Sequence, residues 1–172
     1  MNSNNVSTVD LVKDDLRGAP KKEAFHQKCE ANMFPFSFKR PEGIDIPQKA
    51  IVKIKQNDNE SVNVQILNDG GDNNLHYHPN TDTVWFVLQG QIRFYGPGDK
   101  VIGEYGVHEG IIMPLGARYW FEKLGEEEAH LLQVAIFPKG QANNKRIDVS
   151  GKLKHQGTNM HIDGATGVVI KR

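Results

Sequence analysis

The chain has 172 residues, of which 38% are hydrophobic and 24% are charged, a composition typical of one globular domain. Its 21 Lys and Arg residues balance 21 Asp and Glu residues, so the formal net charge is zero. Without an excess of positive charge the chain has no global field to attract nucleic acid or an anionic membrane, and we expect neither as a partner. No apolar run approaches the ~20 residues that a membrane-spanning helix needs.

The cysteine content and the first residues indicate the compartment. Cys29 is the only cysteine, so no intrachain disulfide and no multi-cysteine zinc site can form. The opening stretch, MNSNNVSTVD, lacks the basic start and the apolar core of a secretory signal. We therefore expect a cytoplasmic protein.

Residues 1–49 predict an N-terminal arm with one short helix. The first twenty residues are rich in Asn, Asp and Ser, a composition that favours a frayed segment. Pro20 is suited to the first turn of a helix, which we expect to continue through residues 21–32. Pro35 and Pro41 then prevent the helix from going further.

From Ala50 onward the pattern changes to short strands separated by Gly, Pro, Asn and Asp turns. No segment is suited to the long crossover helix of a parallel sheet, and the spacing of the turns is typical of sandwiches and barrels. We therefore predict an all-β domain over residues 50–138. The acidic run at residues 126–128 falls in one of its turns and is interpreted as a solvated loop. The expected strands are residues 50–56, 61–67, 83–88, 91–95, 100–106, 110–114, 117–124 and 129–137.

Residues 139–172 are predicted to form a polar C-terminal tail. Only residues 167–170 resemble a strand. The sequence leaves three arrangements open: the tail packs on the barrel, crosses to a second subunit, or lies loose.

The most informative stretch contains two histidines, His76 and His78. Side chains two residues apart on a strand share a face, so both imidazoles are expected to point the same way. Two neutral imidazoles on one strand suit a divalent transition metal. A His-x-His pair also arises by chance in a chain with seven histidines, so the pair alone equally fits an exposed polar face.

The spacing around this pair resembles the first motif of the cupin superfamily. That motif consists of Gly, five residues, His-x-His, three or four residues, Glu, six residues and Gly. Here Gly70 lies six residues before His76, and Gly90 closes the strand that follows. The second cupin motif, Pro-x-Gly-x-x-His, resembles the segment from Pro114 to Tyr119.

The resemblance covers residues 50–137. It implies a double-stranded β-helix, or jelly-roll barrel, with a ligand pocket in its interior. The pattern of strands alone leads to a barrel or a sandwich, and the resemblance narrows this choice to a cupin barrel flanked by the helical N-terminal arm and the extended tail.

Two positions depart from the family pattern. The carboxylate position falls on Thr83, with Asp82 one residue earlier, and the third histidine is replaced by Tyr119. The resemblance implies a centre for Fe, Mn, Ni or Zn with His76, His78 and Asp82 as ligands, and Tyr119 as the catalytic residue. A one-residue bulge reverses which of Asp82 and Thr83 faces the pocket, so that choice stays open.

Strand alternation adds residues to the expected pocket. Thr83 and Trp85 share a face, as do Tyr119 and Phe121. We expect Thr83, Trp85 and Phe121 to bind the substrate, although core packing explains the two larger rings equally well.

Three functions follow from the resemblance. The first, which we favour, is a metal-dependent enzyme that acts on a small organic metabolite by dioxygenase- or isomerase-like chemistry. The second is a metal-free isomerase that uses a histidine as base and Tyr119 as acid, similar to cupin sugar epimerases. The third is a non-catalytic protein that binds a small molecule.

The resemblance also implies a homodimer, because cupin barrels commonly pair through sheet faces. The strand face opposite the expected pocket carries Val84, Phe86 and Leu88, and apolar surface suits such a contact. The expected partners are thus a small-molecule ligand and a second copy of the chain.

Overall fold

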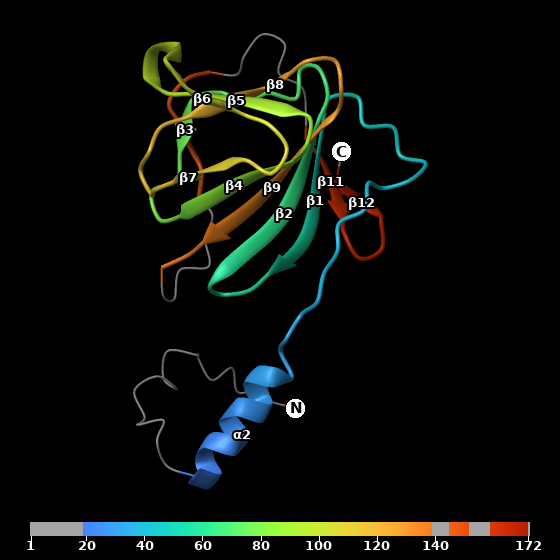
Figure 1. Cartoon of the computed structure of the whole chain (residues 1–172), viewed down its shortest axis with the longest axis vertical. Coiled ribbons are helices and arrows are strands. Elements are labelled where there is room, and N and C mark those ends of the chain that lie inside the picture. Colours follow the sequence, from blue (N-terminus) through green and yellow to red (C-terminus); the bar gives the residue numbers. More distant parts are fainter. Residues whose placement is uncertain (1–18, 139–144, 152–158, 172) are drawn as a thin grey trace. The chain divides into compact units, whose positions relative to one another are not determined.

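The computed structural model describes residues 19–138, 145–151 and 159–171, and the chain divides after Ser37 into two units. In the first unit, helix α2 (Ala19–Glu30) confirms the predicted helix (Figure 1). The segment that was expected to be frayed at the start of the chain lies outside the described residues. Within the described part of the chain, no helix is long and apolar enough to span a bilayer.

The second unit is built from β-strands that form two layers (Figure 1). The larger sheet has the strand order β12-β11-β1-β2-β9-β4-β7, in which β1 and β11 are parallel and the other pairs are antiparallel. Its strands are β1 (Lys49–Gln56), β2 (Glu60–Leu67), β4 (Asp82–Gln89), β7 (Gly110–Met113), β9 (Ala129–Ile136), β11 (Asn159–Asp163) and β12 (Val169–Lys171).

The opposite layer contains a three-stranded sheet of order β6-β5-β8 and the short pair β10-β3. Its elements are β3 (His76–Tyr77), β5 (Gln91–Tyr95), the short helix η1 (Pro97–Asp99), β6 (Val101–Tyr105), β8 (Trp120–Leu124) and β10 (Ile147–Asp148). A β-bridge between His76 and Tyr119 joins β3 to the start of β8, with N–H···O distances of 3.1 and 3.0 Å. This bridge brings the two motif regions of the sequence side by side.

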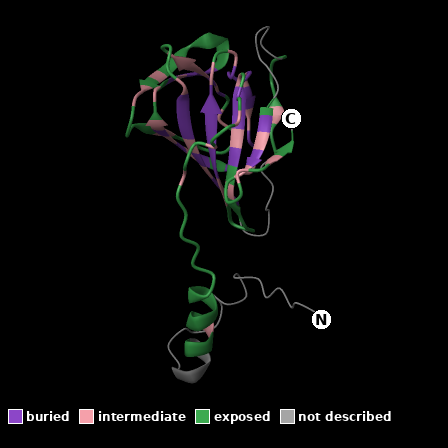
Figure 2. Cartoon of the chain, turned by 90° about the vertical axis from the view of Figure 1, so that its right-hand side faces the viewer, coloured by how far each residue is buried: buried purple, intermediate pink, exposed green. Residues whose placement is uncertain are grey.

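The core lies on both faces of the larger sheet, which explains why five consecutive residues of β2, Asn63 to Leu67, are buried (Figure 2). The inner face carries an apolar cluster centred on Trp85, Phe94 and Phe121. The outer face carries a second cluster, and part of its cover comes from the segment that precedes β1. The members of the outer cluster are Ile46, Ala50, Val52, Ile66, Met160 and Ile162, with Phe38, Ile44 and Val169 packed against them.

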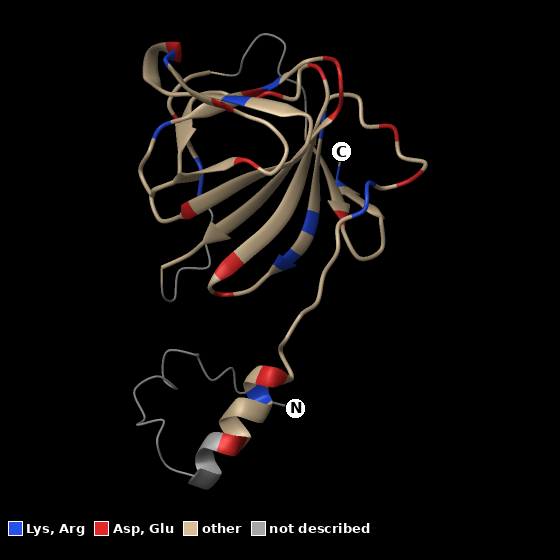
Figure 3. Cartoon of the chain, viewed as in Figure 1, with Lys and Arg blue, Asp and Glu red and all other residues tan. Residues whose placement is uncertain are grey.

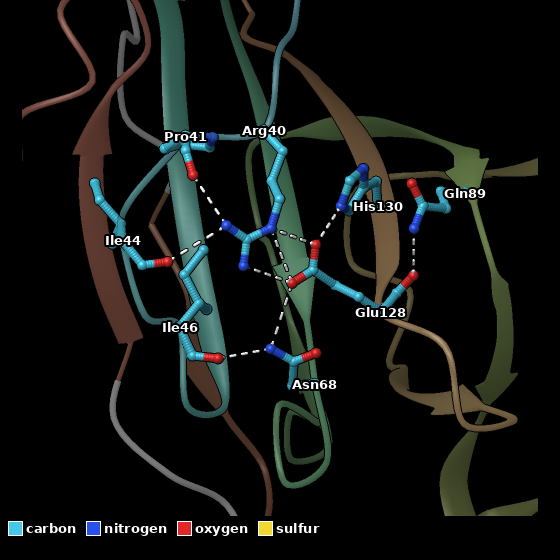
Figure 4. A network of polar contacts seen from close by, with 8 residues as sticks. All are labelled: Arg40, Pro41, Ile44, Ile46, Asn68, Gln89, Glu128 and His130. Atoms are coloured by element: carbon cyan, nitrogen blue, oxygen red, sulfur yellow. Dashed lines mark hydrogen bonds and ion pairs between the residues drawn. The ribbon is translucent and has the colours of Figure 1, made fainter.

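A network of polar contacts fixes the segment before β1 to the sheet (Figure 4). Arg40 donates from Nε and Nη2 to the two oxygens of Glu128, at 2.9 and 3.0 Å. His130 Nε2 lies 2.6 Å from Glu128 Oε1, and Asn68 donates to the Ile46 carbonyl at 2.6 Å. The sequence analysis interpreted Glu128 as part of a solvated loop. In the structure its side chain is instead held by these contacts. Its carboxylate joins two segments that are far apart in the chain.

The described parts of the C-terminal tail belong to the barrel, which is the first of the three arrangements left open by the sequence. Strand β11 extends the larger sheet beside β1, with His161 opposite Ile51, and β10 pairs with β3. The barrel therefore continues beyond residue 138, where the sequence analysis ended it. Residues 139–144 and 152–158 of the tail lie outside the described residues.

The Arg40–Glu128 contact predicts a stability effect. Replacing Glu128→Gln removes the charge that accepts these hydrogen bonds, so we expect the free energy of unfolding near pH 7 to fall by about 1 kcal/mol, a value that allows for solvent screening of the partly exposed pair. The neighbouring exposed residue provides the control Glu127→Gln, for which we expect a change within about 0.5 kcal/mol. Urea unfolding followed by circular dichroism measures both.

The same contact predicts a pH dependence. Burial acts to raise the pKa of Glu128, but the hydrogen bonds from Arg40 and His130 outweigh it and lower the pKa below its ordinary value. The wild type therefore loses this contribution as the pH falls from the ordinary Glu range through the lower pKa. If the difference between wild type and Glu128→Gln does not shrink on acidification, the ionised contact is not the source of the stability.

Candidate functional site

A pocket of about 320 Å³, here called the barrel pocket, lies between the inner face of the larger sheet and the β3–β10 side of the barrel. A second hollow of about 560 Å³ shares Ile51, Gln133 and His161 with it. The barrel pocket is lined by Lys49, Ile51, Gln65, Asn73, His76, His78, Trp85, Gln133, Arg146, Asn159 and His161.

Strand register explains how polar side chains from distant segments meet in this pocket. Gln65 lies opposite Ile51, and Gln133 lies opposite Trp85, on adjacent strands of the larger sheet. Both glutamines are buried at inward positions, where an apolar residue would fill a core. Buried polar groups are costly unless they have partners, so their presence here indicates a binding site.

The two histidines of the sequence motif both line the barrel pocket. Their side chains are buried, and their ring centroids are 5.3 Å apart. The Nδ1 atom of His76 lies 2.7 Å from the Asn74 carbonyl, and that of His78 lies 3.0 Å from the Lys145 carbonyl. A carbonyl only accepts, so each Nδ1 carries the hydrogen and each Nε2 keeps its lone pair for a guest.

Both imidazoles are neutral near pH 7. Burial, together with the nearby charge of Arg146, lowers the pKa of His76 to about 3. Burial also lowers the pKa of His78. The two rings therefore act as hydrogen-bond acceptors in the empty protein.

Two cationic residues that the sequence analysis did not select, Lys49 and Arg146, also line the pocket. Lys49 stands at the start of β1, a strand with several basic residues (Figure 3), and is only 5% exposed. Its Nζ lies 5.0 Å from the centroid of the Phe121 ring. Burial and the charge of Arg146 lower its pKa to about 7, and Asp72 acts in the opposite direction.

Arg146 is held in place by polar neighbours. It donates from Nε to Asp148 at 2.7 Å and from Nη2 to the side-chain oxygen of Asn74. Asn74 also accepts from His76 through its backbone carbonyl, so the guanidinium and the imidazole share one support. None of the described residues that line the pocket is an Asp or a Glu. The acidic groups that act on its two cations, Asp148 on Arg146 and Asp72 on Lys49, lie outside this lining.

The structure does not bring Asp82 to the two histidines. Along β4, Thr83 and Trp85 are buried and point inward, whereas Asp82 is exposed. Its Oδ1 accepts a hydrogen bond from the Leu115 backbone N–H at 2.8 Å. The interpretation of Asp82 as a ligand therefore needs correction, because the regular alternation of β4 directs its carboxylate away from the pocket.

Tyr119 lies beside His76, with 4.6 Å between the ring centroids, but it is not among the residues that line the pocket. Its hydroxyl accepts a hydrogen bond from Trp85 Nε1 at 3.3 Å. Burial raises the pKa of Tyr119 to about 12, so the phenol stays protonated. The ring supports His76 from within the apolar cluster.

Only one of the three residues expected to bind the substrate lines the pocket. Trp85 lines the pocket, whereas Thr83 and Phe121 are buried beside it and do not line it. Among the missed residues, Lys49 and Gln65 had a signal in the sequence, because strand alternation places both on the inward face with Ile51 and Leu67.

A metal centre at this site would need its ligands from these side chains. The Nε2 atoms of the two histidines suit two ligand positions. Among the described residues, however, no three His, Cys, Asp or Glu side chains are grouped so that they could hold an ion. Lys49 and Arg146 also oppose a dication at the same place. The described residues therefore do not complete the metal centre expected from the sequence.

Comparisons with known proteins identify the family. The sequence model of the Cupin family matches residues 50–151, which is more than half of the chain. The chain therefore belongs to the cupin family, and the predicted double-stranded β-helix is confirmed. Comparison with curated proteins gave no match.

Solved structures agree on the fold. An uncharacterised double-stranded β-helix protein from Klebsiella pneumoniae has a TM-score of 0.57 at 18% identity, covering 71% of this chain and 96% of that one. Recombinant oxalate oxidase in complex with glycolate gives 0.52 at 19% identity, covering 67% and 63%. Peruvianin-I, a cysteine peptidase from Thevetia peruviana latex, gives 0.51 at 15% identity, covering 70% and 78%. An oxidase, a peptidase and an uncharacterised protein share this likeness, so it establishes the fold alone.

The low pKa of His76 predicts an acid-sensitive stability. The unfolded chain binds a proton at the ordinary histidine pKa, whereas folded His76 does so only near a pKa of about 3. Stability is therefore fully present above about pH 6.5 and is lost as the pH falls, by up to about 1.4 kcal/mol per pH unit for one proton.

Urea unfolding between about pH 7 and pH 4 measures this slope. We expect a shallower slope for His76→Gln than for wild type, and an unchanged slope for His26→Gln, which alters an exposed histidine of helix α2. Equal slopes in all three proteins would contradict the assignment of a neutral buried imidazole at position 76.

Proposed function

We propose that this cupin binds a small organic anion in the barrel pocket, with a carboxylate as its charged group, and acts on it by proton transfer. One observation carries this proposal: buried Lys49 and the more exposed Arg146 line one pocket whose described lining includes no acidic residue. A carboxylate in this pocket would accept hydrogen bonds from both cationic groups. The planar guanidinium of Arg146 also suits the two oxygens of a carboxylate.

The amide groups in the pocket favour a guest that carries hydroxyl groups. Asn63 and Gln65 both donate to the side-chain oxygen of Gln133, at 3.0 and 3.3 Å. This leaves both buried side-chain oxygens without a partner; Gln65 lines the barrel pocket, whereas Asn63 lines the second hollow. A hydroxyl donor on the guest would satisfy such an oxygen, since an unpaired buried acceptor costs about 1–3 kcal/mol. A hydroxy acid therefore suits both the cationic and the amide groups.

The imidazoles supply the proposed chemistry. A bound carboxylate adds negative charge beside His76 and His78, which raises the pKa of each ring from its low value in the empty pocket. A base becomes more effective as its pKa approaches the working pH, so the substrate itself would activate the ring that removes its proton. Tyr119 supports His76 in this scheme and does not act on the substrate.

The oxalate oxidase of similar fold was solved with glycolate, a small hydroxy acid. This does not assign a substrate to the present chain, because the identity is only 19%. It does make glycolate and its larger relatives reasonable first probes.

A metal-dependent reaction, expected from the sequence, is the second candidate. The observation that favours it is the hydrogen bonding of both Nδ1 atoms to backbone carbonyls, an arrangement that commonly orients metal-binding histidines. An ion bound there would act as a Lewis acid or a redox centre. It would need further ligands beyond the two imidazoles.

Carboxylate binding is measured by isothermal titration calorimetry with glycolate, lactate and larger hydroxy acids. We expect at least one to bind the wild type, and Arg146→Gln to weaken binding by about 10- to 100-fold, the loss expected for a charged hydrogen bond. The control Arg118→Gln removes an exposed arginine that does not line the pocket and should leave the affinity unchanged. Equal weakening by both variants would show that net charge alone controls binding.

Binding should also be coupled to proton uptake. Lys49 has a pKa of about 7 in the empty pocket, and a bound carboxylate raises that pKa, so near pH 7.5 the complex takes up part of a proton. Calorimetry in buffers of different ionisation enthalpy detects this uptake. Lys49→Met should abolish most of it; an unchanged uptake in that variant would assign the proton to another group.

Metal addition separates the two candidates. The anion proposal predicts that Mn²⁺, Fe²⁺, Ni²⁺ or Zn²⁺ shifts the thermal midpoint equally in wild type and in His78→Asn. A stabilisation present in wild type and absent from His78→Asn would instead favour the metal-dependent function.

A further inference from the structure

Lys49 combines features that a simple binding lysine does not need. Its side chain enters the barrel from the first position of β1, where Leu67 and Asn159 are its register partners on either side. Its Nζ lies above the ring of Phe121 and within the lining of the barrel pocket. Lysines are rarely this deeply buried, because the ammonium ion loses its hydration.

Burial has a chemical consequence for this amine. The neighbouring cation Arg146 and the apolar ring of Phe121 surround it, and Asp72 is the acidic group that opposes their effect. The pKa of about 7 leaves a large fraction of free amine at neutral pH. A free amine is a nucleophile, and desolvation beside a second cation is a known way to produce one.

Arg146 determines how a carbonyl compound would meet this nucleophile. In a 2-oxo acid the carbonyl carbon is bonded directly to the carboxylate carbon. If Arg146 holds the carboxylate, the carbonyl lies one bond away from the anchored group, within the pocket that Lys49 also lines. Such positioning converts the addition into an effectively intramolecular reaction.

We propose that Lys49 forms an imine with the carbonyl carbon of a small 2-oxo acid whose carboxylate is held by Arg146. This inference rests on the proposed carboxylate-binding function and names the substrate class for that pocket. The imine would be a covalent step at Lys49, a residue outside the sequence motif that contains the two histidines.

The step balances without any oxidant or reductant. The Nζ lone pair forms a bond to the carbonyl carbon, the C=O π pair moves to oxygen, and oxygen takes up the proton that nitrogen loses. The hydroxyl then leaves as water after gaining a second proton, while nitrogen loses its remaining one and forms the C=N bond. Both Nδ1 atoms donate to backbone carbonyls, so the Nε2 atoms of His76 and His78 are left as acceptors that can take up and return these protons.

An imine is a stronger electron acceptor than the carbonyl it replaces, particularly when protonated. It would stabilise the negative charge left when a proton is removed from the neighbouring carbon. The product class is therefore an isomerised 2-oxo acid or one exchanged at that carbon.

Reductive trapping tests the inference on the full-length protein. The protein is incubated with pyruvate or glyoxylate and sodium cyanoborohydride near pH 7, and the adduct is located by intact mass and peptide mapping. We expect one predominant adduct, on Lys49. Lys49→Arg should remove it, whereas the control Lys53→Arg, which alters an exposed lysine of the same strand, should retain it.

A second variant keeps the test decisive if Lys49→Arg does not fold. Arg146→Gln removes the carboxylate anchor and also a cation that lowers the pKa of Lys49, so trapping on Lys49 at limiting pyruvate should fall by at least about 10- to 100-fold. No adduct on Lys49, or adducts spread evenly over exposed lysines, overturns the inference.

Calorimetry with lactate, which has the carboxylate but no carbonyl, separates the two proposals. Lactate binding without trapping of pyruvate leaves the carboxylate pocket intact and rejects the imine. Failure of both lactate binding and pyruvate trapping rejects the proposed function as well.

Discussion

The burial of positive charge without an acidic lining residue is the constraint on which the barrel pocket depends. Lys49 is 5% exposed, and Arg146 lines the same small cavity. Removing an ion from water costs several kcal/mol even after the protein relaxes. Lys49 avoids part of this cost by binding its proton less tightly, whereas Arg146 is exposed and contacts Asp148 and Asn74. A protein maintains such a site at the expense of stability, which is typical of functional pockets.

The scaffold keeps this pocket open because β1 is held firmly from its other face. Ala50 and Val52 point outward into the second apolar cluster, so Lys49 and Ile51, which alternate with them, point inward toward the pocket. Arg40 and Glu128 fix the chain segment that covers this cluster. That segment leads directly into β1, so the polar contact outside the barrel supports the strand that carries the amine inside it.

Much of the fold, but only part of the site, could be predicted from the sequence. Apolar alternation located most of the strands, and the motif spacing identified the family. Strand β11 was missed although Met160 and Ile162 alternate with polar neighbours, because the tail around them is polar. Asp82 does not lie with the two histidines, because alternation along β4 directs its side chain outward. No pattern in the sequence pointed to Arg146. Its position depends on the pairing of β10 with β3, in which Ile147 lies opposite Tyr77, seventy residues earlier in the chain.

Under the proposed function, the electrostatics of the pocket distinguish the two kinds of guest that a pair of histidines suggests. Neutral Nε2 atoms accept a dication or a hydrogen-bond donor equally well, so the imidazoles alone do not distinguish them. Lys49 and Arg146 do, because their charge repels a cation and attracts a carboxylate. The same carboxylate would raise the pKa of the amine and of both imidazoles together, so filling the pocket changes the protonation of all its basic groups. A site with this coupling suits a reaction in which the substrate brings the charge and the protein moves the proton.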